Sequence, residues 1–168
     1  MTADGAPLPH RENKERDFMQ VLAIDIGGTS VKILATGQKV PRKFPSGPKM
    51  TPGQMVAGVK ELAKDWEYDV VSVGFPAKVV KDRIAKEPNN LGRGWKGFDF
   101  KAAFNRPVKV INDAAMQALG SCETGTILFL GFGTGLGSAL IVRGHIVPLE
   151  LGQLSYRRGI AEDYLGVR

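Results

Sequence analysis

The sequence predicts an α/β fold, and three segments carry that prediction. Residues 22–34 and 126–142 each read as an apolar strand, a glycine turn and a second apolar strand. Between them, residues 108–119 begin as a short strand and continue into helix formers. In α/β folds, polar groups at the end of a strand are a usual source of ligand contacts. The polar residues of these three segments are therefore the first candidates for a functional site.

The first segment carries the sequence Asp25-Ile-Gly-Gly-Thr29 between its two strands. Gly27 and Gly28 predict a turn at positive φ, which glycine adopts more readily than other residues. Backbone N–H groups in such a turn, with the Thr29 hydroxyl, can hold a phosphate, and Asp25 can hold the Mg²⁺ that accompanies it. An ordinary glycine hairpin with a surface aspartate is the alternative that this segment leaves open.

The second segment repeats the design with the sequence Gly131-Phe-Gly-Thr-Gly-Leu-Gly137. This spacing differs from the dinucleotide pattern G-x-G-x-x-G, and no helix signal follows it, so a Rossmann site is disfavoured. The chain also contains no G-x-x-x-x-G-K-[ST] motif, which excludes a P-loop. The two strand–glycine–strand hairpins instead suggest two turns that hold one phosphate chain from opposite sides.

The third segment places Asn112 and Asp113 where a strand passes into a helix. Asp113 can accept the proton of a substrate hydroxyl, which is the general-base step in phosphoryl transfer to an alcohol. The alternative is that one of the two residues only caps the helix. Both interpretations hold together if Asn112 caps the helix while Asp113 faces the site.

Four ordered motifs together resemble the ROK family of sugar kinases, with the polyphosphate glucokinases as the most similar branch. The motifs are Asp25–Lys32, Asn112-Asp113, Gly131–Gly137 and Glu150-Leu-Gly-Gln153. The resemblance runs from about Leu22 to the end of the chain. It implies an α/β, actin-like (ribonuclease H-like) fold with a sugar and a phosphoryl donor between two lobes. The implied reaction transfers a phosphoryl group from polyphosphate or ATP to the 6-hydroxyl of glucose or a similar hexose.

The resemblance also implies a role for each matching residue. Asp113 is the implied catalytic base, and Asp25 the implied Mg²⁺ contact, directly or through water. The implied phosphate-binding residues are Asp25, Gly27, Gly28, Thr29, Lys32, Gly133, Thr134 and Gly135. The implied sugar-binding residues are Asn90, Asn112, Asp113, Glu150, Gln153 and Glu162. Two alternatives stay open, because Glu162 at a helix start reads equally as a solvated charge and Asn90 as a loop cap.

Three departures from the family pattern stand out. Gln153 replaces a histidine that supports the sugar and, with cysteines, binds zinc in many members; with one cysteine in the chain, no structural zinc is expected. Ala77 replaces a usual glycine, which requires negative φ there. The chain also ends soon after Gln153, so residues 123–168 are expected to form only the beginning of a second lobe. Residues 1–18 are expected to be a flexible arm and 19–122 the N-terminal lobe.

Composition and charge complete the expectations. Lys and Arg outnumber Asp and Glu by 23 to 17, and the resulting net charge of +6 favours polyanionic partners such as polyphosphate. Basic residues cluster at Lys39–Lys49 and Lys78–Lys86, with a solvated surface as the plain alternative. Nucleic-acid binding is disfavoured because aromatic residues are not interleaved with these charges. No apolar run is long enough to span a membrane. A cytoplasmic protein is expected, with a homodimer as an open assembly and a non-catalytic sugar-binding or regulatory module as the alternative function.

Overall fold

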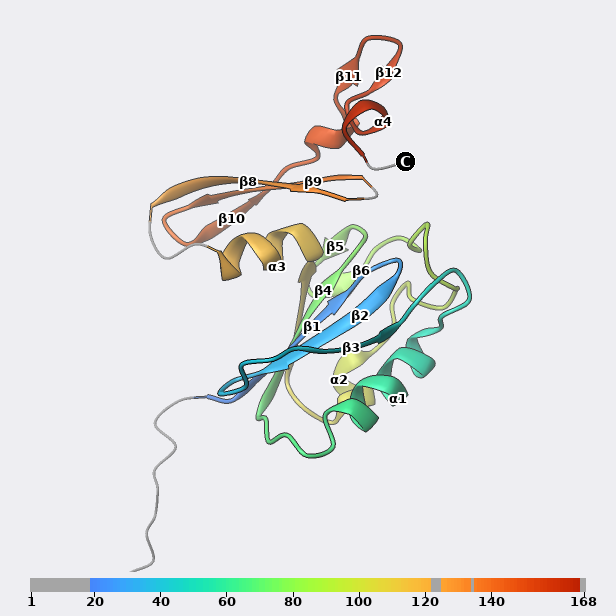
Figure 1. The fold of residues 1–168 in the computed structure, drawn as a ribbon, viewed down its shortest axis with the longest axis vertical. Coiled ribbons are helices and arrows are strands. Elements are labelled where there is room, and N and C mark those ends of the chain that lie inside the picture. The colour runs from blue at the N-terminus through green and yellow to red at the C-terminus, as the bar shows by residue number, and fades with distance from the viewer. Residues whose placement is uncertain (1–18, 122–124, 134, 167–168) are drawn as a thin grey trace, which may run out of the picture.

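The computed structural model describes residues 19–121, 125–133 and 135–166, which form two larger sheets with one helix between them and two short two-stranded hairpins (Figure 1). The larger sheet has five strands in the order β3-β2-β1-β4-β7. Its strands are β1 (Val21–Ile26), β2 (Ser30–Ala35), β3 (Arg42–Pro45), β4 (Val70–Phe75) and β7 (Val108–Asn112). β1 runs antiparallel to β2 and parallel to β4, and β4 runs parallel to β7. Residues of the predicted phosphate turn therefore lie at the carboxyl end of a central strand.

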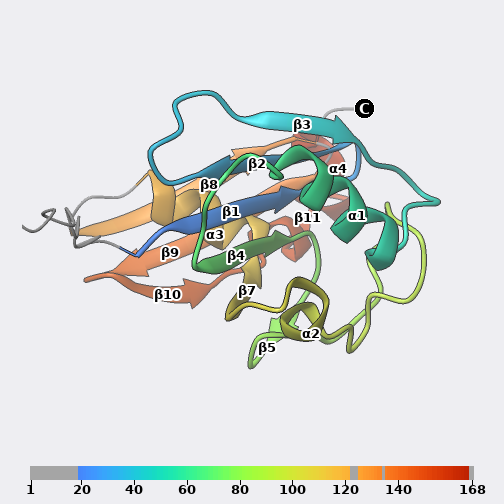
Figure 2. The same ribbon diagram turned by 90° about the horizontal axis from the view of Figure 1, so that it is seen from below.

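One face of the five-stranded sheet packs into the main hydrophobic core. Alternate residues of β1 point into it, and Leu22, Ile24 and Ile26 are fully buried. The helices α1 (Pro52–Leu62) and α2 (Phe100–Phe104) cover this face, and Figure 2 shows them in front of the sheet with the second sheet behind. Because strand side chains alternate between faces, Asp25 and Lys32 lie on the opposite face.

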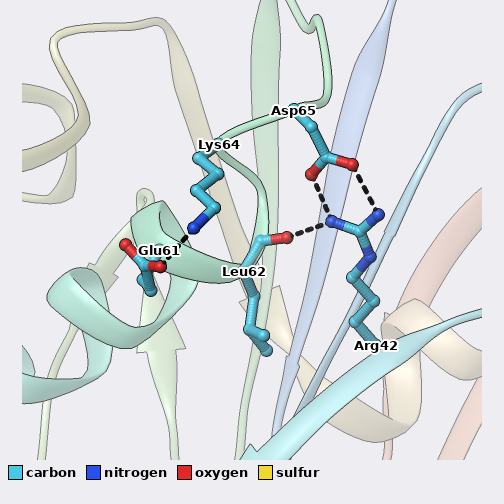
Figure 3. Close-up of polar contacts among 5 residues, drawn as sticks. All are labelled: Arg42, Glu61, Leu62, Lys64 and Asp65. Carbon is cyan, nitrogen blue, oxygen red and sulfur yellow. Dashed lines mark hydrogen bonds and ion pairs between the residues drawn. The ribbon is translucent and has the colours of Figure 1, made fainter.

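Helix α1 begins at a capping box and is tied to the edge strand β3 at its end. The Thr51 hydroxyl accepts a hydrogen bond from the N–H of Gln54, and the side-chain oxygen of Gln54 accepts one from the N–H of Thr51. At the other end, the Arg42 guanidinium donates to the Leu62 carbonyl and to both carboxylate oxygens of Asp65 (Figure 3). The hydrogen bond from Arg42 lowers the pKa of Asp65 to about 2. Arg42 also lies 4.2 Å from the ring centre of Trp66, a core residue.

The second sheet has three strands in the order β10-β9-β8. They are β8 (Thr126–Phe132), β9 (Leu136–Val142) and β10 (His145–Pro148). Their inner face packs on a small cluster built from Ala115, Ala118, Ala139 and Ile141. Leu128, Leu130 and Phe132 alternate onto the outer face of β8 and are 42–62% exposed. The second sheet is therefore covered on one side only within the described residues.

Helix α3 (Asp113–Gly120) lies between the two sheets (Figure 1). On one side, the Met116 sulfur lies 3.9 Å from the Ser72 hydroxyl of β4. On the other side, Ala115 and Ala118 belong to the cluster under the second sheet. The small alanine side chains let α3 approach β9 closely. The helix therefore packs on both sheets, and its first residue is the candidate base Asp113.

The remaining elements are short. They are β5 (Val79–Val80), β6 (Arg83–Ile84), the 3₁₀ turn η1 (Leu151–Gln153), β11 (Ser155–Tyr156), β12 (Gly159–Ile160) and α4 (Glu162–Leu165). The backbone of Ala77 does not have a positive φ, as an alanine in place of the usual glycine requires. The predicted arm at 1–18 and the predicted lobe boundary between residues 122 and 123 lie outside the described residues. Within the described ranges, no helix combines the length and hydrophobicity needed to cross a membrane.

Candidate active site

One row of residues crosses all five strands of the larger sheet on the face toward α3. In register, Ile111 of β7 pairs with Gly74 of β4, Gly74 with Asp25, Asp25 with Lys32, and Lys32 with Lys43 of β3. The Lys32 ammonium lies 3.8 Å from a carboxylate oxygen of Asp25. The register therefore brings two of the predicted phosphate-binding residues together at the middle of the sheet.

Gly74 leaves the space that Asp113 needs above this row. A Cβ built on Gly74 would lie 3.3 Å from the Cα of Asp113 and 2.6 Å from the terminal methyl of Met116. Asn112 caps α3, because its side-chain oxygen accepts a hydrogen bond from the N–H of Ala115 at 3.2 Å. Asp113 follows as the first helical residue. The sequence interpretation that Asn112 caps the helix is thus confirmed.

The environment of Asp113 favours a stronger base than an exposed aspartate. Burial raises the pKa of its carboxyl above the ordinary value, the N–H of Ala114 acts in the opposite direction, and the nearby negative charge of Asp25 raises it further. The charge of Asp25 acts on Asp113 because the two carboxylates lie near each other on this face of the sheet. A carboxylate with a raised pKa accepts a proton more readily than one with the ordinary value.

The β1–β2 turn is fastened from behind by Ser46, which follows β3. The Ser46 hydroxyl donates to the Gly27 carbonyl, and the Ser46 N–H donates to the Thr29 carbonyl at 3.0 Å. Because C=O and N–H point in opposite directions across a planar trans peptide, the Gly28 N–H points away from Ser46. The N–H groups of Gly28 and Thr29 have no hydrogen-bond partner among the described residues. The turn therefore presents two adjacent donors, as an anion site requires.

The predicted reason for the two glycines of this turn is wrong. Neither Gly27 nor Gly28 has a positive φ. Instead, a Cβ on Gly27 would lie 3.0 Å from the Ser30 carbonyl oxygen, and a Cβ on Gly28 would lie 2.9 Å from the Cβ of Asn90. Close approach of neighbouring chain segments, rather than backbone conformation, excludes larger residues here.

The loop that carries Asn90 is held over the turn by Glu87. Burial raises the pKa of the Glu87 carboxyl, but this carboxyl accepts hydrogen bonds from the N–H groups of Lys96, Trp95 and Gly94, which lower it. The net pKa lies below the usual range of a glutamate. Trp95 in the same loop is fully buried and packs on Phe75 with ring centres 5.0 Å apart. Asn90 itself is exposed and contacts Gly28, so the structure brings it to the phosphate turn.

The β8–β9 turn is closed on itself and supported by Glu162. Gly133 donates through its N–H to the Gly135 carbonyl at 3.0 Å, and Thr134 between them lies outside the described residues. The Glu162 carboxylate accepts a hydrogen bond from the Leu136 N–H at 3.2 Å. A Cβ on Gly135 would lie 2.5 Å from the same carboxylate. Glu162 is thus half-buried against the second turn, and its alternative interpretation as a solvated charge is wrong.

Glu150 and Gln153 are exposed at the two ends of η1. The buried Ser138 of β9 holds this segment, because its hydroxyl donates to the Leu149 carbonyl and accepts from the Leu151 N–H. The side chains of Glu150 and Gln153 form no hydrogen bond or ion pair with another described residue. The structure therefore gathers Asp25, Lys32, Asn90, Asn112, Asp113 and the first turn, whereas Glu150 and Gln153 lie on the second sheet's side without a direct link.

Three residues that position the site escaped the sequence analysis. Ser46 holds the first turn, Glu87 holds the Asn90 loop, and Ser138 holds the Glu150 segment. Each acts through hydrogen bonds to backbone groups in another part of the chain. No local spacing rule marks such residues, so only the folded chain identifies them.

The donor set of this site fits Mg²⁺. Within the described residues, no group of three or more His, Cys, Asp or Glu side chains forms a complete metal cage. Asp25 and Asp113 are two carboxylates at the phosphate turn. Mg²⁺ is typically held by one or two carboxylates, several waters and substrate phosphates rather than by an all-protein cage. Oxygen ligands from Asp25, with the phosphates of a bound donor, match this preference.

The two sheets, the intervening helix and the glycine turns define the actin-like fold of ROK sugar kinases, which solved structures of this class share. The chain belongs to the ROK family, whose model matches residues 21–152. Inorganic polyphosphate/ATP-glucomannokinase from Arthrobacter sp. strain KM superposes with a TM-score of 0.74 and 29% identity, over 89% of this chain and 69% of that one.

Curated relatives give the same family. A polyphosphate glucokinase of Mycobacterium tuberculosis is 28% identical over 162 residues, covering 83% of this chain and 60% of that protein. A polyphosphate glucokinase of Mycobacterium leprae is 30% identical over 151 residues, covering 78% and 46%. The chain thus spans 60% or less of the length of these curated relatives.

Proposed function

We propose that this chain carries the phosphate-binding and base-bearing part of a sugar kinase that transfers a phosphoryl group from polyphosphate or ATP to the 6-hydroxyl of glucose or a similar hexose. The observation that carries the proposal is the meeting of Asp113, Asp25 and the unpaired N–H groups of Gly28 and Thr29. A base, a metal-binding carboxylate and an anion site are the three parts that phosphoryl transfer to an alcohol requires. The polyphosphate and glucose relatives support the choice of donor and acceptor.

In the proposed mechanism, each residue has a defined role. The Asp113 carboxylate accepts the proton of the attacking sugar hydroxyl, and Asn112, Asn90, Glu150, Gln153 and Glu162 are the proposed sugar contacts. The N–H groups of Gly28 and Thr29 and the ammonium of Lys32 hold the donor phosphates, with Gly133–Gly135 on the opposite side. Asp25 would hold Mg²⁺, which would neutralise part of the negative charge of the donor phosphates. Fixed donors aimed at the transferred group stabilise its charge without reorganisation during the reaction.

The test is sugar phosphorylation by the purified chain with Mg²⁺, with glucose as acceptor and polyphosphate and ATP as separate donors. Asp113→Asn is expected to lower kcat about 10²- to 10⁴-fold, the usual contribution of a general base, while glucose binding by calorimetry is retained. Asp82→Asn is the matched control, since Asp82 is exposed in the β5–β6 turn at positive φ, which asparagine also tolerates.

Two outcomes contradict the proposal. Equal activity of Asp113→Asn and the unchanged chain excludes Asp113 as the base. Glucose binding without product from either donor favours a non-catalytic sugar-binding module instead.

A further inference from the structure

The row of cross-strand partners continues beyond Asp25 to the edge of the sheet as two lysines. Lys32 of β2 and Lys43 of β3 pair directly in register, and both are exposed. Arg42 and Phe44, the neighbours of Lys43, point to the other face, where Arg42 stacks on Trp66 and Phe44 approaches Gly58 of α1. Lys43 therefore points to the same side as Asp25 and Lys32.

The two lysines are an unfavourable pair when the site is empty. Like charges directly opposite each other on neighbouring strands are destabilising. Lys32 is balanced by Asp25 at 3.8 Å, whereas Lys43 forms no hydrogen bond or ion pair with any described residue. An anion beside the two ammonium groups would remove this repulsion.

The spacing of the strands limits which anion reaches both lysines. Neighbouring strands lie about 4.8 Å apart, so β3 is about 10 Å from β1. The Gly27–Thr29 turn begins at the end of β1. A phosphate held by the Gly28 and Thr29 N–H groups lies at one end of this row. A ligand that carries negative charge along its whole length can contact the turn, Lys32 and Lys43 together.

We propose that Lys32 and Lys43 form a track for an extended inorganic polyphosphate chain whose reacting end lies at the Gly27–Thr29 turn. The inference rests on the proposed function for the position of the reacting phosphate, and it assigns the rest of the donor to the open face of β2 and β3. A nucleoside triphosphate is the competing occupant. It differs from polyphosphate because its negative charge ends after three phosphates.

The experiment measures equilibrium binding of long-chain polyphosphate, tripolyphosphate and ATP to the unchanged chain, Lys43→Gln and Lys43→Glu, at two salt concentrations. Lys101→Gln and Lys101→Glu are the matched controls, because Lys101 is exposed on α2, which covers the other face of the sheet. These controls change the net charge equally without touching the row. Binding is measured without sugar, so the result is independent of catalysis.

Lys43→Gln is expected to weaken long-chain polyphosphate binding about two- to fivefold at low salt, as for one exposed ionic contact, and to flatten its salt dependence. Lys43→Glu weakens it further, while tripolyphosphate and ATP binding stay unchanged. Equal losses in the Lys101 variants, equal losses for all three ligands, or no loss with Lys43→Gln overturn the track. Polyphosphate binding that follows this pattern without sugar phosphorylation overturns the proposed function alone.

Discussion

The two sheets carry the same strand–glycine turn–strand design but are stabilised very differently. The five-stranded sheet sits on a core of fully buried aliphatic and aromatic residues, including Ile24, Phe75 and Trp95. The three-stranded sheet rests on three alanines and Ile141, and its outer face leaves Leu128 and Phe132 exposed. The difference teaches that similar local sequence does not imply similar local stability, because packing area and not the turn motif stabilises each hairpin.

The two glycine turns are correspondingly held in different ways. The first turn is fixed by Ser46 and by the loop anchored at Glu87, both of which belong to the larger sheet's side of the molecule. The second turn depends on Glu162, in the four-residue helix α4. We therefore expect the second turn to open at lower free energy than the first, since few buried contacts oppose its motion.

The largest effect is expected in the cores of the two sheets. Ile24→Ala should lower the free energy of unfolding by about 3–5 kcal/mol, and Ile141→Ala by about 2–3 kcal/mol, because the smaller cluster loses fewer contacts and relaxes more easily around the cavity. Both side chains are fully buried, so the substitutions are matched in chemistry and exposure. Urea denaturation measures both values. Equal losses would show that the two cores are equally well packed.

A second comparison uses the two serines that fasten the functional segments. Ser138→Ala should cost about 1–3 kcal/mol, because it leaves the Leu149 carbonyl and Leu151 N–H without their buried partner. Ser46→Ala should cost about 1 kcal/mol, because only the bond to the Gly27 carbonyl is lost. Ser46→Ala should also raise the KM for the donor, and Ser46→Thr, which keeps the hydroxyl, should restore it. A donor KM unaffected by Ser46→Ala would remove Ser46 from the positioning of the turn.

The helix shared by both sheets allows a test by pH. Burial and the charge of Asp25 raise the pKa of Asp113 in the folded chain. Ionisation of Asp113 therefore disfavours folding at every pH above the pKa that it has in the unfolded chain. Asp113→Asn should therefore raise the melting temperature at pH 7, and the gain should vanish below about pH 3.9, where the carboxyl is protonated in both states. Melting curves across this range measure the effect. A gain that persists in acid would have a cause other than ionisation.

The smallest effect is expected on the open face of the second sheet. Leu128→Thr replaces an exposed leucine with a residue of high strand propensity, so the free energy of unfolding should change by less than about 0.5 kcal/mol. Leu34→Thr on β2, where Leu34 is 37% exposed, is the matched substitution in the larger sheet. A large loss from Leu128→Thr, measured by urea denaturation, would show that this face is covered in solution.

The sequence by itself determined the strands that flank the two glycine turns, the junction of strand and helix at Asn112, and the family. These features depend on local patterns: alternating apolar residues, glycines at strand ends, and an asparagine before a run of helix formers. The pattern of four ordered motifs was sufficient for the ROK assignment that the family model also gives. Asp25 and Asp113 were predictable as candidates because strand ends carry polar groups.

Only the tertiary structure decided how these residues meet and why the glycines are there. Register across the five strands places Asp25, Lys32 and Lys43 in one row, and no sequence spacing encodes that order. The glycines at 28 and 74 are required by segments that approach from elsewhere in the chain, namely the loop that carries Asn90 and helix α3. Long-range packing also buries Trp95 and brings the Ser46 hydroxyl to the Gly27 carbonyl. The physical reason is that local preference sets the shape of each segment, while burial and backbone hydrogen bonding set the arrangement between them.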